Sequence, residues 1–276
     1  METDKDPEGQ AKLLAELRAI HEQLARLEIR VDALSGKKTA PEAVVRTFVE
    51  GLDDGLGGGI PGGHVVLLGG PSGTMKTSLA LYIMQKNRMA DVRGIYVTLE
   101  ESRESLLKTM TRLGIGTDED FIVDIGKLRM DHESADEPRD WLQILKDYLS
   151  RRLEKGKLDL VVIDPLNSLY ALAGIKDPRK DLFHFFAFLR GIGVTTILIM
   201  EADSQERFFA NHEDYLADGV LTLDFPRNDT GELLPRLRCV KMRHTEHSRA
   251  PFQLVFENGR FAANSWSATA DGSAVR

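Results

Sequence analysis

From Val44 onward, short runs of apolar residues alternate with segments in which apolar residues recur at helical spacing. The short runs predict strands at 64–69, 94–99, 158–164, 194–200, 219–225, 237–243 and 252–261. The longer segments predict helices at 76–89, 102–113, 138–155 and 178–190. Continuous Val, Ile and Leu runs separated by helices are typical of a parallel sheet covered on both faces. The pattern therefore predicts an α/β domain with a mostly parallel central sheet flanked by helices.

The pattern changes towards the end of the chain. No further helical segment follows the run at 219–225, so we expect the last strands to form antiparallel hairpins at one edge of the sheet. The residues from Ala263 onward, ANSWSATADGSAVR, carry no strand or helix pattern. We expect them to be a disordered tail over 263–276.

Residues 11–34, which precede the α/β pattern, have a different spacing of apolar residues. Apolar residues there recur at alternating intervals of four and three, at Leu13, Leu17, Ile20, Leu24, Leu27, Val31 and Leu34. This is a heptad seam over about three repeats, with charged residues on its flanks. It predicts an N-terminal coiled-coil helix within 1–36 that pairs with another helix. A single amphipathic helix docked on its own domain is the alternative.

The segment SGKKTAPEA, at 35–43, interrupts the heptads with the residue types of a linker. The expected organisation is therefore a helix at 1–36, a linker at 37–43, an α/β domain at 44–262 and the tail. A chain of 276 residues suits this arrangement of one domain plus an appendage.

Composition narrows the functional class. The chain is 42% hydrophobic and 29% charged, which describes an ordinary globular protein. Its single cysteine, Cys239, permits no disulfide within the chain, which suits a reducing cytoplasm. We find no leader pattern in METDKDPEGQ and no run of 18 apolar residues, so we expect a cytoplasmic protein without a membrane span. The net charge of −7 argues against binding to nucleic acid through phosphate contacts.

One motif carries most of the chemistry. The stretch from Gly70 to Thr77 follows an apolar strand, opens a helix, and matches G-x-x-x-x-G-K-[ST] at every fixed position except Met75. In such a P-loop, backbone N–H groups and the helix N-terminus hold phosphate, and the lysine meets the β and γ phosphates. The predicted nucleotide-binding residues are Gly70, Ser72, Gly73, Thr74, Met75, Lys76, Thr77 and Ser78.

Met75 stands where the motif has glycine. If this position needs a positive φ, a side chain costs about 1–2 kcal/mol, and its bulk could crowd the phosphate. That cost is small beside charged hydrogen bonds to a triphosphate, each worth roughly 1.5–3 kcal/mol. We therefore expect weakened binding of ATP rather than none.

Acidic residues after two other strands complete the expected site. Asp164 ends LDLVVID, at the carboxyl end of a buried strand, and would hold Mg²⁺ together with the Thr77 hydroxyl. In VTLEES, Glu100 and Glu101 lie at the end of another apolar strand and could orient or activate water at the γ-phosphate. The alternatives are that Asp164 caps the next turn and that the glutamates favour the first turn of a helix starting near Ser102.

Together these segments resemble the KaiC-like branch of the RecA-type ATPases. The resemblance covers residues 44–262 and includes GLDDGLGGGIPGG, the P-loop, the paired glutamates, the Walker-B acid and a late K-x-R. It implies a RecA-like P-loop NTPase fold, Mg²⁺-dependent ATP hydrolysis and assembly into a ring, which we expect to be a hexamer. It also implies that Glu100 and Glu101 are the catalytic pair, and that Lys241 and Arg243 reach the γ-phosphate of a neighbouring subunit. Without the resemblance, these two cations would be ordinary protection of an edge strand.

The chain departs from the family pattern in three places. Met75 breaks the loop consensus, and one ATPase domain is present where the clock protein that names the family has two. The segment HEDYLADGVLTL, from His212, has no Ser/Thr pair, which argues against clock-type autokinase activity. The heptads at 11–34 lie outside the family core, and we expect them to bind a protein partner.

Three functions remain open from the sequence. The first is a ring-forming, Mg²⁺-dependent ATPase that couples its nucleotide state to partner interaction or signalling, and it is favoured by Glu100 and Glu101. The second is a nucleotide-dependent binding or scaffold module with little turnover, favoured by Met75. The third is a RecA-like DNA-binding recombination protein, which the acidic balance disfavours.

Overall fold

The computed structural model describes residues 44–126, 140–172, 178–202, 209, 211–227, 231 and 233–266. The chain divides into two compact units, Met1–Glu42 and Ala43–Arg276, and the fold below is that of the second unit. The coiled-coil helix expected over 11–34 and the linker expected at 37–43 lie outside the described residues. Among the residues that are described, no helix has the length and apolar character needed to cross a lipid bilayer.

The elements alternate along the chain much as the hydrophobic pattern predicts. The strands are β1 Val44–Val45, β2 Ile60–Pro61, β3 Val65–Gly70, β4 Gly94–Thr98, β5 Ile122–Asp124, β6 Leu160–Asp164, β7 Thr195–Glu201, β8 Gly219–Asp224, β9 Arg236–Met242, β10 Phe252–Glu257 and β11 Arg260–Ser265. The helices are α2 Leu52–Gly55, α3 Lys76–Met89, α4 Arg103–Arg112, α6 Trp141–Glu154, α7 Leu166–Leu172, α8 Pro178–Gly191 and α9 Glu213–Leu216.

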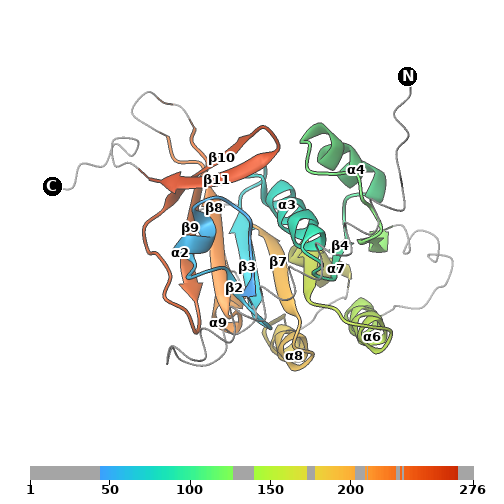
Figure 1. Cartoon of the computed structure of the whole chain (residues 1–276). Coiled ribbons are helices and arrows are strands. Elements are labelled where there is room, and N and C mark those ends of the chain that lie inside the picture. The colour runs from blue at the N-terminus through green and yellow to red at the C-terminus, as the bar shows by residue number, and fades with distance from the viewer. Residues whose placement is uncertain are drawn as a thin grey trace, which may run out of the picture. The chain divides into compact units, whose positions relative to one another are not determined.

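Nine of the strands form one sheet, in the order β11-β10-β9-β8-β3-β7-β6-β4-β5 (Figure 1). The six strands from β8 to β5 pair in parallel, whereas β8–β9, β9–β10 and β10–β11 pair antiparallel. This confirms the predicted parallel sheet with antiparallel strands at its C-terminal edge. The β3 strand lies inside the sheet between β8 and β7. The segment that follows it therefore begins at the carboxyl ends of the parallel strands, which we call the carboxyl edge, near the middle of the sheet.

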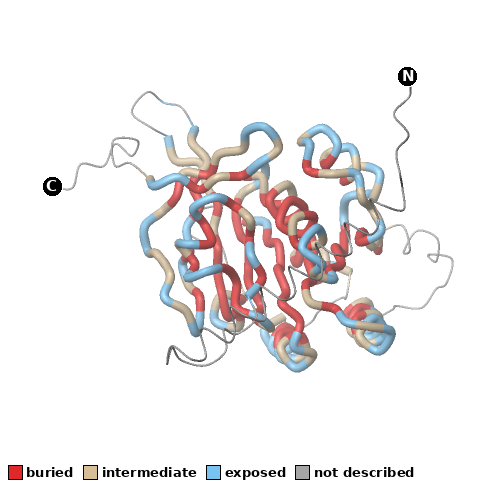
Figure 2. The backbone as a smooth tube through the Cα atoms, viewed as in Figure 1, coloured by how far each residue is buried: buried red, intermediate tan, exposed pale blue. Residues whose placement is uncertain are grey.

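Both faces of the sheet are covered, and the strands are buried along most of their length (Figure 2). Side chains alternate between the two faces: Val66 and Leu68 of β3 join a core with α3 and α4, whereas Val65 and Leu67 join a second core with α6, α7 and α8. The aromatic segment DLFHFFAFLR belongs to α8, which contributes Phe185 and Phe186 to the second core.

The C-terminal hairpin corrects two expectations. The run 252–261 is not one strand, because Asn258 and Gly259 adopt positive φ of 51° and 75° and reverse the chain between β10 and β11. An Asn-Gly pair is the preferred loop of a two-residue hairpin, and it stood in the sequence. Residues 263–265, which were expected to belong to the tail, are instead part of β11: this strand continues to Ser265, and Ala263 is buried and donates its N–H to the Glu50 carbonyl.

Short elements escaped the periodicity. The three-residue β5 and the seven-residue α7 were not predicted, because neither is long enough to show a clear repeat. The predicted helix at 138–155 begins at Trp141 in the structure, where the Asp140 side chain accepts a hydrogen bond from the Gln143 N–H. The α4 helix begins after Ser102, as expected, and the Ser102 hydroxyl accepts from the Ser105 N–H.

The packing of α8 generates a test with a control on the same helix. Phe186 is 0% exposed and Phe183 is 54% exposed. We expect Phe186→Ala to lower the free energy of unfolding by about 3–5 kcal/mol, because it removes buried area and leaves a cavity. Phe183→Ala should change it by less than about 0.5 kcal/mol. Urea unfolding followed by circular dichroism measures both, and equal effects would show that α8 presents a different face to the sheet.

Candidate functional site

The predicted P-loop connects the end of β3 to the start of α3. Gly70 is the last residue of β3, and Lys76, Thr77 and Ser78 form the first turn of α3. A Cβ at Gly70 would lie 2.5 Å from the Leu223 carbonyl oxygen of β8, so this position needs glycine. The loop thus lies at the carboxyl edge of the sheet, beside the positively polarised N-terminus of α3.

The middle of the loop combines exposed backbone with an internal brace. Ser72 and Gly73 are exposed, and Gly73 has a φ of 83°. Thr74 is buried, and its hydroxyl donates to the Pro71 carbonyl oxygen at 2.8 Å. The Thr74 backbone N–H donates to the same carbonyl at 3.4 Å, so both donors of Thr74 stabilise the loop itself.

Met75 adopts the backbone conformation that the motif's glycine would adopt. Its φ of 66° and ψ of 21° lie in the left-handed region, immediately before α3. A side chain in this region costs about 1–2 kcal/mol. The Met75 side chain is half-buried and packs against the core on the α3 face of the sheet, which offsets part of that cost. The loop therefore keeps its turn with methionine in the glycine position.

Lys76 is held at the base of the loop. Its Nζ donates to the carbonyl oxygens of Gly70 and Pro71, both at 2.8 Å, and the residue is 5% exposed. Burial lowers the pKa of Lys76, while the negative charges of Glu201 and Asp164 oppose that shift. The ammonium group thus lies close to two carboxylates at the carboxyl edge of the sheet.

Asp164 ends β6 and lies beside the first turn of α3. Its Oδ2 accepts hydrogen bonds from the Thr77 hydroxyl at 2.8 Å and from the Tyr96 hydroxyl on β4. Burial raises the pKa of Asp164, and these two hydrogen bonds together with the charge of Lys76 oppose the rise. The carboxylate therefore faces the P-loop helix, as a Walker-B acid would.

The donor atoms of Thr77 and Asp164 fit a magnesium ion. Mg²⁺ prefers oxygen ligands and is usually held by one or two carboxylates together with the phosphates of a substrate. The hydroxyl and carboxylate oxygens already lie within 2.8 Å of each other. Thr77 and Asp164 are therefore the residues that would hold such an ion in this chain.

Glu100 and Glu101 lie on the same edge, between β4 and α4. Thr98 of β4 pairs with Asp164 of β6. The two glutamates come two and three residues after Thr98, so they lie just past the Asp164 carboxylate in the strand direction. Both are exposed. Glu101 accepts a hydrogen bond from the Ser105 hydroxyl in the first turn of α4. This contact agrees with the helix-start alternative for Glu101.

Glu100 contacts a different element. Its Oε1 accepts a hydrogen bond from the Ser168 hydroxyl of α7, the helix that follows Asp164. The carboxylate is thus fixed between β4 and α7 at the mouth of the site. Among the hydrogen bonds of the described residues, the Glu100 side chain forms none with α4, whereas the Glu101 side chain forms one.

Lys241 and Arg243 lie near the amino-terminal ends of the parallel strands, opposite the strand ends that carry the P-loop. Lys241 on β9 pairs with Val220 of β8, which in turn pairs with Leu67 of β3. This level is about 10 Å short of Gly70 along the strands, at 3.3 Å per residue, and β9 is two strands away from β3. The structure therefore does not bring these two cations to the P-loop of their own chain.

Both cations have partners near these amino-terminal strand ends. The Lys241 Nζ donates to the carbonyl oxygens of Asp214 and Ala217 at 2.9 and 2.7 Å. Arg243 forms an ion pair with Asp218 at 3.0 Å. Burial and the nearby charge of Arg243 lower the pKa of Lys241, while Asp218 and Asp214 oppose the shift.

Three further residues of the site were missed in the sequence. Tyr96 lies on β4 and is fully buried, so in the sequence it is indistinguishable from an aromatic residue that only packs in the core. In the structure its hydroxyl donates a hydrogen bond to Asp164. Glu201 ends β7, and Ser168 belongs to the unpredicted α7. The acid at the end of the apolar run VTTILIM was a usable signal for Glu201, since it repeats the placement of Asp164.

Comparison with known proteins agrees with this geometry. Residues 45–260 match the family described as "ATPase: KaiC". A UPF0273 protein of Thermotoga maritima is 30% identical over 228 residues, which cover 76% of this chain and 92% of that protein. A second UPF0273 protein, from Aeropyrum pernix, is 31% identical over 226 residues, covering 76% and 90%.

The circadian clock oscillator protein KaiC of Synechococcus elongatus is 30% identical over 222 residues, which cover 76% of this chain but only 42% of that protein. Among solved structures, a KaiC-like protein from Pyrococcus horikoshii OT3 matches with a TM-score of 0.67 and 27% identity, covering 81% of this chain and 99% of that one. The match thus includes the sheet, the P-loop, the acidic edge and the K-x-R strand, and this chain belongs to the KaiC family of RecA-type ATPases.

Proposed function

We propose that this chain binds ATP with Mg²⁺ and hydrolyses it. The observation that carries the proposal is the convergence of Lys76, Thr77 and Asp164 at one edge of the sheet, with Thr77 and Asp164 2.8 Å apart. Membership of an ATPase family supports the same reaction. Met75 is compatible with ATP binding, because the loop retains the left-handed turn at that position despite its strain.

Each residue would have a distinct part in the reaction. The loop N–H groups, the α3 N-terminus and Lys76 would bind the β and γ phosphates. Thr77 and Asp164 would hold Mg²⁺, which neutralises charge on the phosphates when bound. Glu100 would orient the attacking water or accept its proton, with Ser168 fixing its carboxylate. Glu101 would assist from the start of α4.

The positions of Lys241 and Arg243 support a site shared between chains. Neither reaches the P-loop of its own chain, so a role at the γ-phosphate requires a neighbouring chain that presents its β9 strand. A closed ring of head-to-tail contacts provides such neighbours for every chain. We therefore propose a homo-oligomeric ring, with a hexamer as the expected size, and a protein partner that binds the helix at 11–34.

A second candidate is a nucleotide-dependent scaffold with little turnover. The left-handed Met75 supports it, because the strained position lies next to the lysine that would contact the phosphates. In this function ATP would mainly control assembly, and the partner would read the assembled state through the helix at 11–34.

Turnover separates the two functions. We expect Lys76→Ala to weaken ATP binding about 10- to 100-fold, because it removes charged hydrogen bonds to phosphate. Glu100→Gln should lower kcat about 10²- to 10⁴-fold and change the Kd for ATP by less than about threefold. Phosphate release and calorimetry with ATP and Mg²⁺ measure these effects. Glu104→Gln, in the first turn of α4, is the matched control. If the native chain turns over ATP no faster than Glu100→Gln, the ATPase function is rejected and the scaffold function is supported.

The cost of Met75 can be divided into strain and bulk. Met75→Gly removes both, whereas Met75→Ala removes the bulk but keeps the Cβ that disfavours a φ of 66°. We expect Met75→Gly to raise the affinity for ATP several-fold, with Met75→Ala between the two, because relief of about 1 kcal/mol corresponds to about a fivefold change. Calorimetric titration measures the affinity. Unchanged affinity in both variants would show that Met75 does not limit binding.

The shared site predicts complementation. Lys241→Ala should lose turnover and keep ATP binding, because Lys241 would act on the nucleotide of a neighbour. Mixing Lys241→Ala with Lys76→Ala protein should restore part of the activity at interfaces that join an intact P-loop to an intact β9. Arg238→Ala, exposed on the same strand, is the control. A monomer in ATP and Mg²⁺ by light scattering, or no recovery in the mixture, would contradict the shared site.

A further inference from the structure

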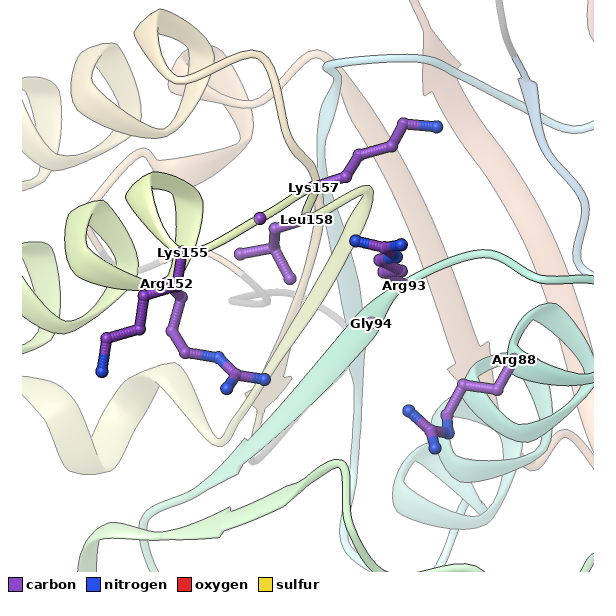
Figure 3. A pocket seen from close by; sticks show the side chains of 8 residues that line it. Arg88, Arg93, Gly94, Arg152, Lys155, Lys157 and Leu158 are labelled. Atoms are coloured by element: carbon purple, nitrogen blue, oxygen red, sulfur yellow. The ribbon is translucent and has the colours of Figure 1, made fainter.

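A basic pocket lies at the amino edge of the sheet, away from the P-loop. It has a volume of about 260 Å³ and is built by the end of α3, the start of β4 and the end of α6 with the loop that follows it (Figure 3). Five of its eight lining residues are cationic: Arg88, Arg93, Arg152, Lys155 and Lys157. This concentration of positive charge contrasts with the net charge of −7 on the whole chain.

Two of the five cations are paired with acids. Arg88 donates through Nε and Nη2 to the Asp118 carboxylate at 3.0 and 2.7 Å, and these bonds hold the pKa of Asp118 below its usual value. Lys157 forms an ion pair with Asp159 at 3.0 Å. The other three, Arg93, Arg152 and Lys155, form no ion pair within the part of the chain that the structure describes.

Helix ends explain only part of this cluster. Residues from the C-terminal ends of α3 and α6 both line the pocket, and cations near a helix C-terminus are stabilised by its dipole. That accounts for Arg88, Arg152 and Lys155. Arg93 precedes a strand, and its Nη1 lies 3.3 Å from where a Cβ of Gly156 would be. The glycine therefore leaves room for the Arg93 guanidinium beside the α6 segment.

The close view separates the arginines from the lysines (Figure 3). The Arg152 side chain extends from α6 towards β4, Arg88 extends from α3 towards the same strand, and Arg93 stands at the start of that strand, next to Gly94. The side chains of Lys155 and Lys157 extend away from the strand in this view. The guanidinium groups of the pocket thus come from α3, α6 and the residue before β4, whereas the two lysine side chains point away from β4.

We propose that this pocket is a second anion site that binds a phosphate group, with Arg93 and Arg152 as its main ligands. Guanidinium groups bind phosphate oxygens through paired hydrogen bonds, and they remain charged throughout the physiological range. Arg88, already fixed by Asp118, supplies a third guanidinium in a set position. The volume is below the roughly 300–1,000 Å³ of pockets that enclose a drug-sized ligand, so it suits a small phosphate compound or the phosphate end of a larger one.

This site is distinct from the proposed nucleotide site. Gly94 and Leu160 pair at the start of β4 and β6, whereas Asp164 ends β6, about 13 Å farther along the strand. The α3 helix connects the two sites, since it begins at Lys76 and carries Arg88 in its last turn. Because the residues differ, each site can be disabled without altering the other.

The test uses the full chain with the P-loop disabled. In a Lys76→Ala background with EDTA, which removes Mg²⁺, calorimetric titration with inorganic pyrophosphate should still show one binding event. We expect Arg93→Ala or Arg152→Ala, added to that background, to weaken this binding at least tenfold, because each removes a charge-assisted pair of hydrogen bonds.

The matched control is Arg151→Ala, which removes the same charge from the same turn of α6 but does not line the pocket. It should change the affinity less than threefold. Absence of binding in the Lys76→Ala background, or equal losses in the Arg151→Ala and Arg152→Ala variants, would overturn the proposal. Circular dichroism and thermal unfolding establish that each variant is folded.

The source of the phosphate is distinguished by a second titration. Phosphoserine is used in parallel with pyrophosphate in the same background. Tighter binding of pyrophosphate indicates a free polyphosphate ligand, and tighter binding of phosphoserine indicates a phosphorylated side chain. If Arg152→Ala abolishes the binding of whichever compound binds, the result supports the proposed anion site. If the compound still binds to that variant with unchanged affinity, the result contradicts the site.

Discussion

The buried carboxylate of Asp164 joins the three elements on which the proposed nucleotide site depends. It ends β6, and it accepts hydrogen bonds from Thr77 on α3 and Tyr96 on β4. A carboxylate that is 8% exposed is costly to keep unless hydrogen bonds compensate for its lost hydration. These two hydroxyls therefore stabilise the charge and fix α3 against the sheet. Because Lys76 precedes Thr77, the same contacts also fix the base of the P-loop.

The two ends of the parallel strands carry side chains of different chemistry in this molecule. Helix N-termini and the acids at the ends of β4, β6 and β7 gather at the carboxyl edge. Helix C-termini and the basic pocket gather at the amino edge, where their charges complement the helix dipoles. Antiparallel β9 carries Lys241 and Arg243 towards the amino edge. Lys241 and Arg243 consequently lie apart from the P-loop within one chain, and the proposed shared site would require a neighbouring chain to bring them together.

The sequence predicted most strands of the sheet, the long helices, the P-loop and the acid at the end of β6, because each depends on local periodicity or a contiguous motif. The Asn258–Gly259 turn was also local, but a continuous apolar pattern on both sides concealed it. Tyr96, Ser168 and Glu201 were missed for a different reason. Their roles depend on contacts across the fold. Nothing in the segments of Tyr96 and Ser168 distinguishes them from a core aromatic and a helix serine, whereas the position of Glu201 after an apolar run was a signal that could have been used.

By itself, the sequence determined the α/β class, the position of the phosphate loop and the residue types able to hold phosphate and magnesium. Only the tertiary structure decided which of those residues meet. Tyr96 and Asp164 are 68 positions apart, and their contact requires β4 to pair with β6 in one register. The arginines of the basic pocket likewise come from separate elements and form no motif. Periodicity and turn chemistry act over a few residues, whereas strand order and register are set by burial of both sheet faces together.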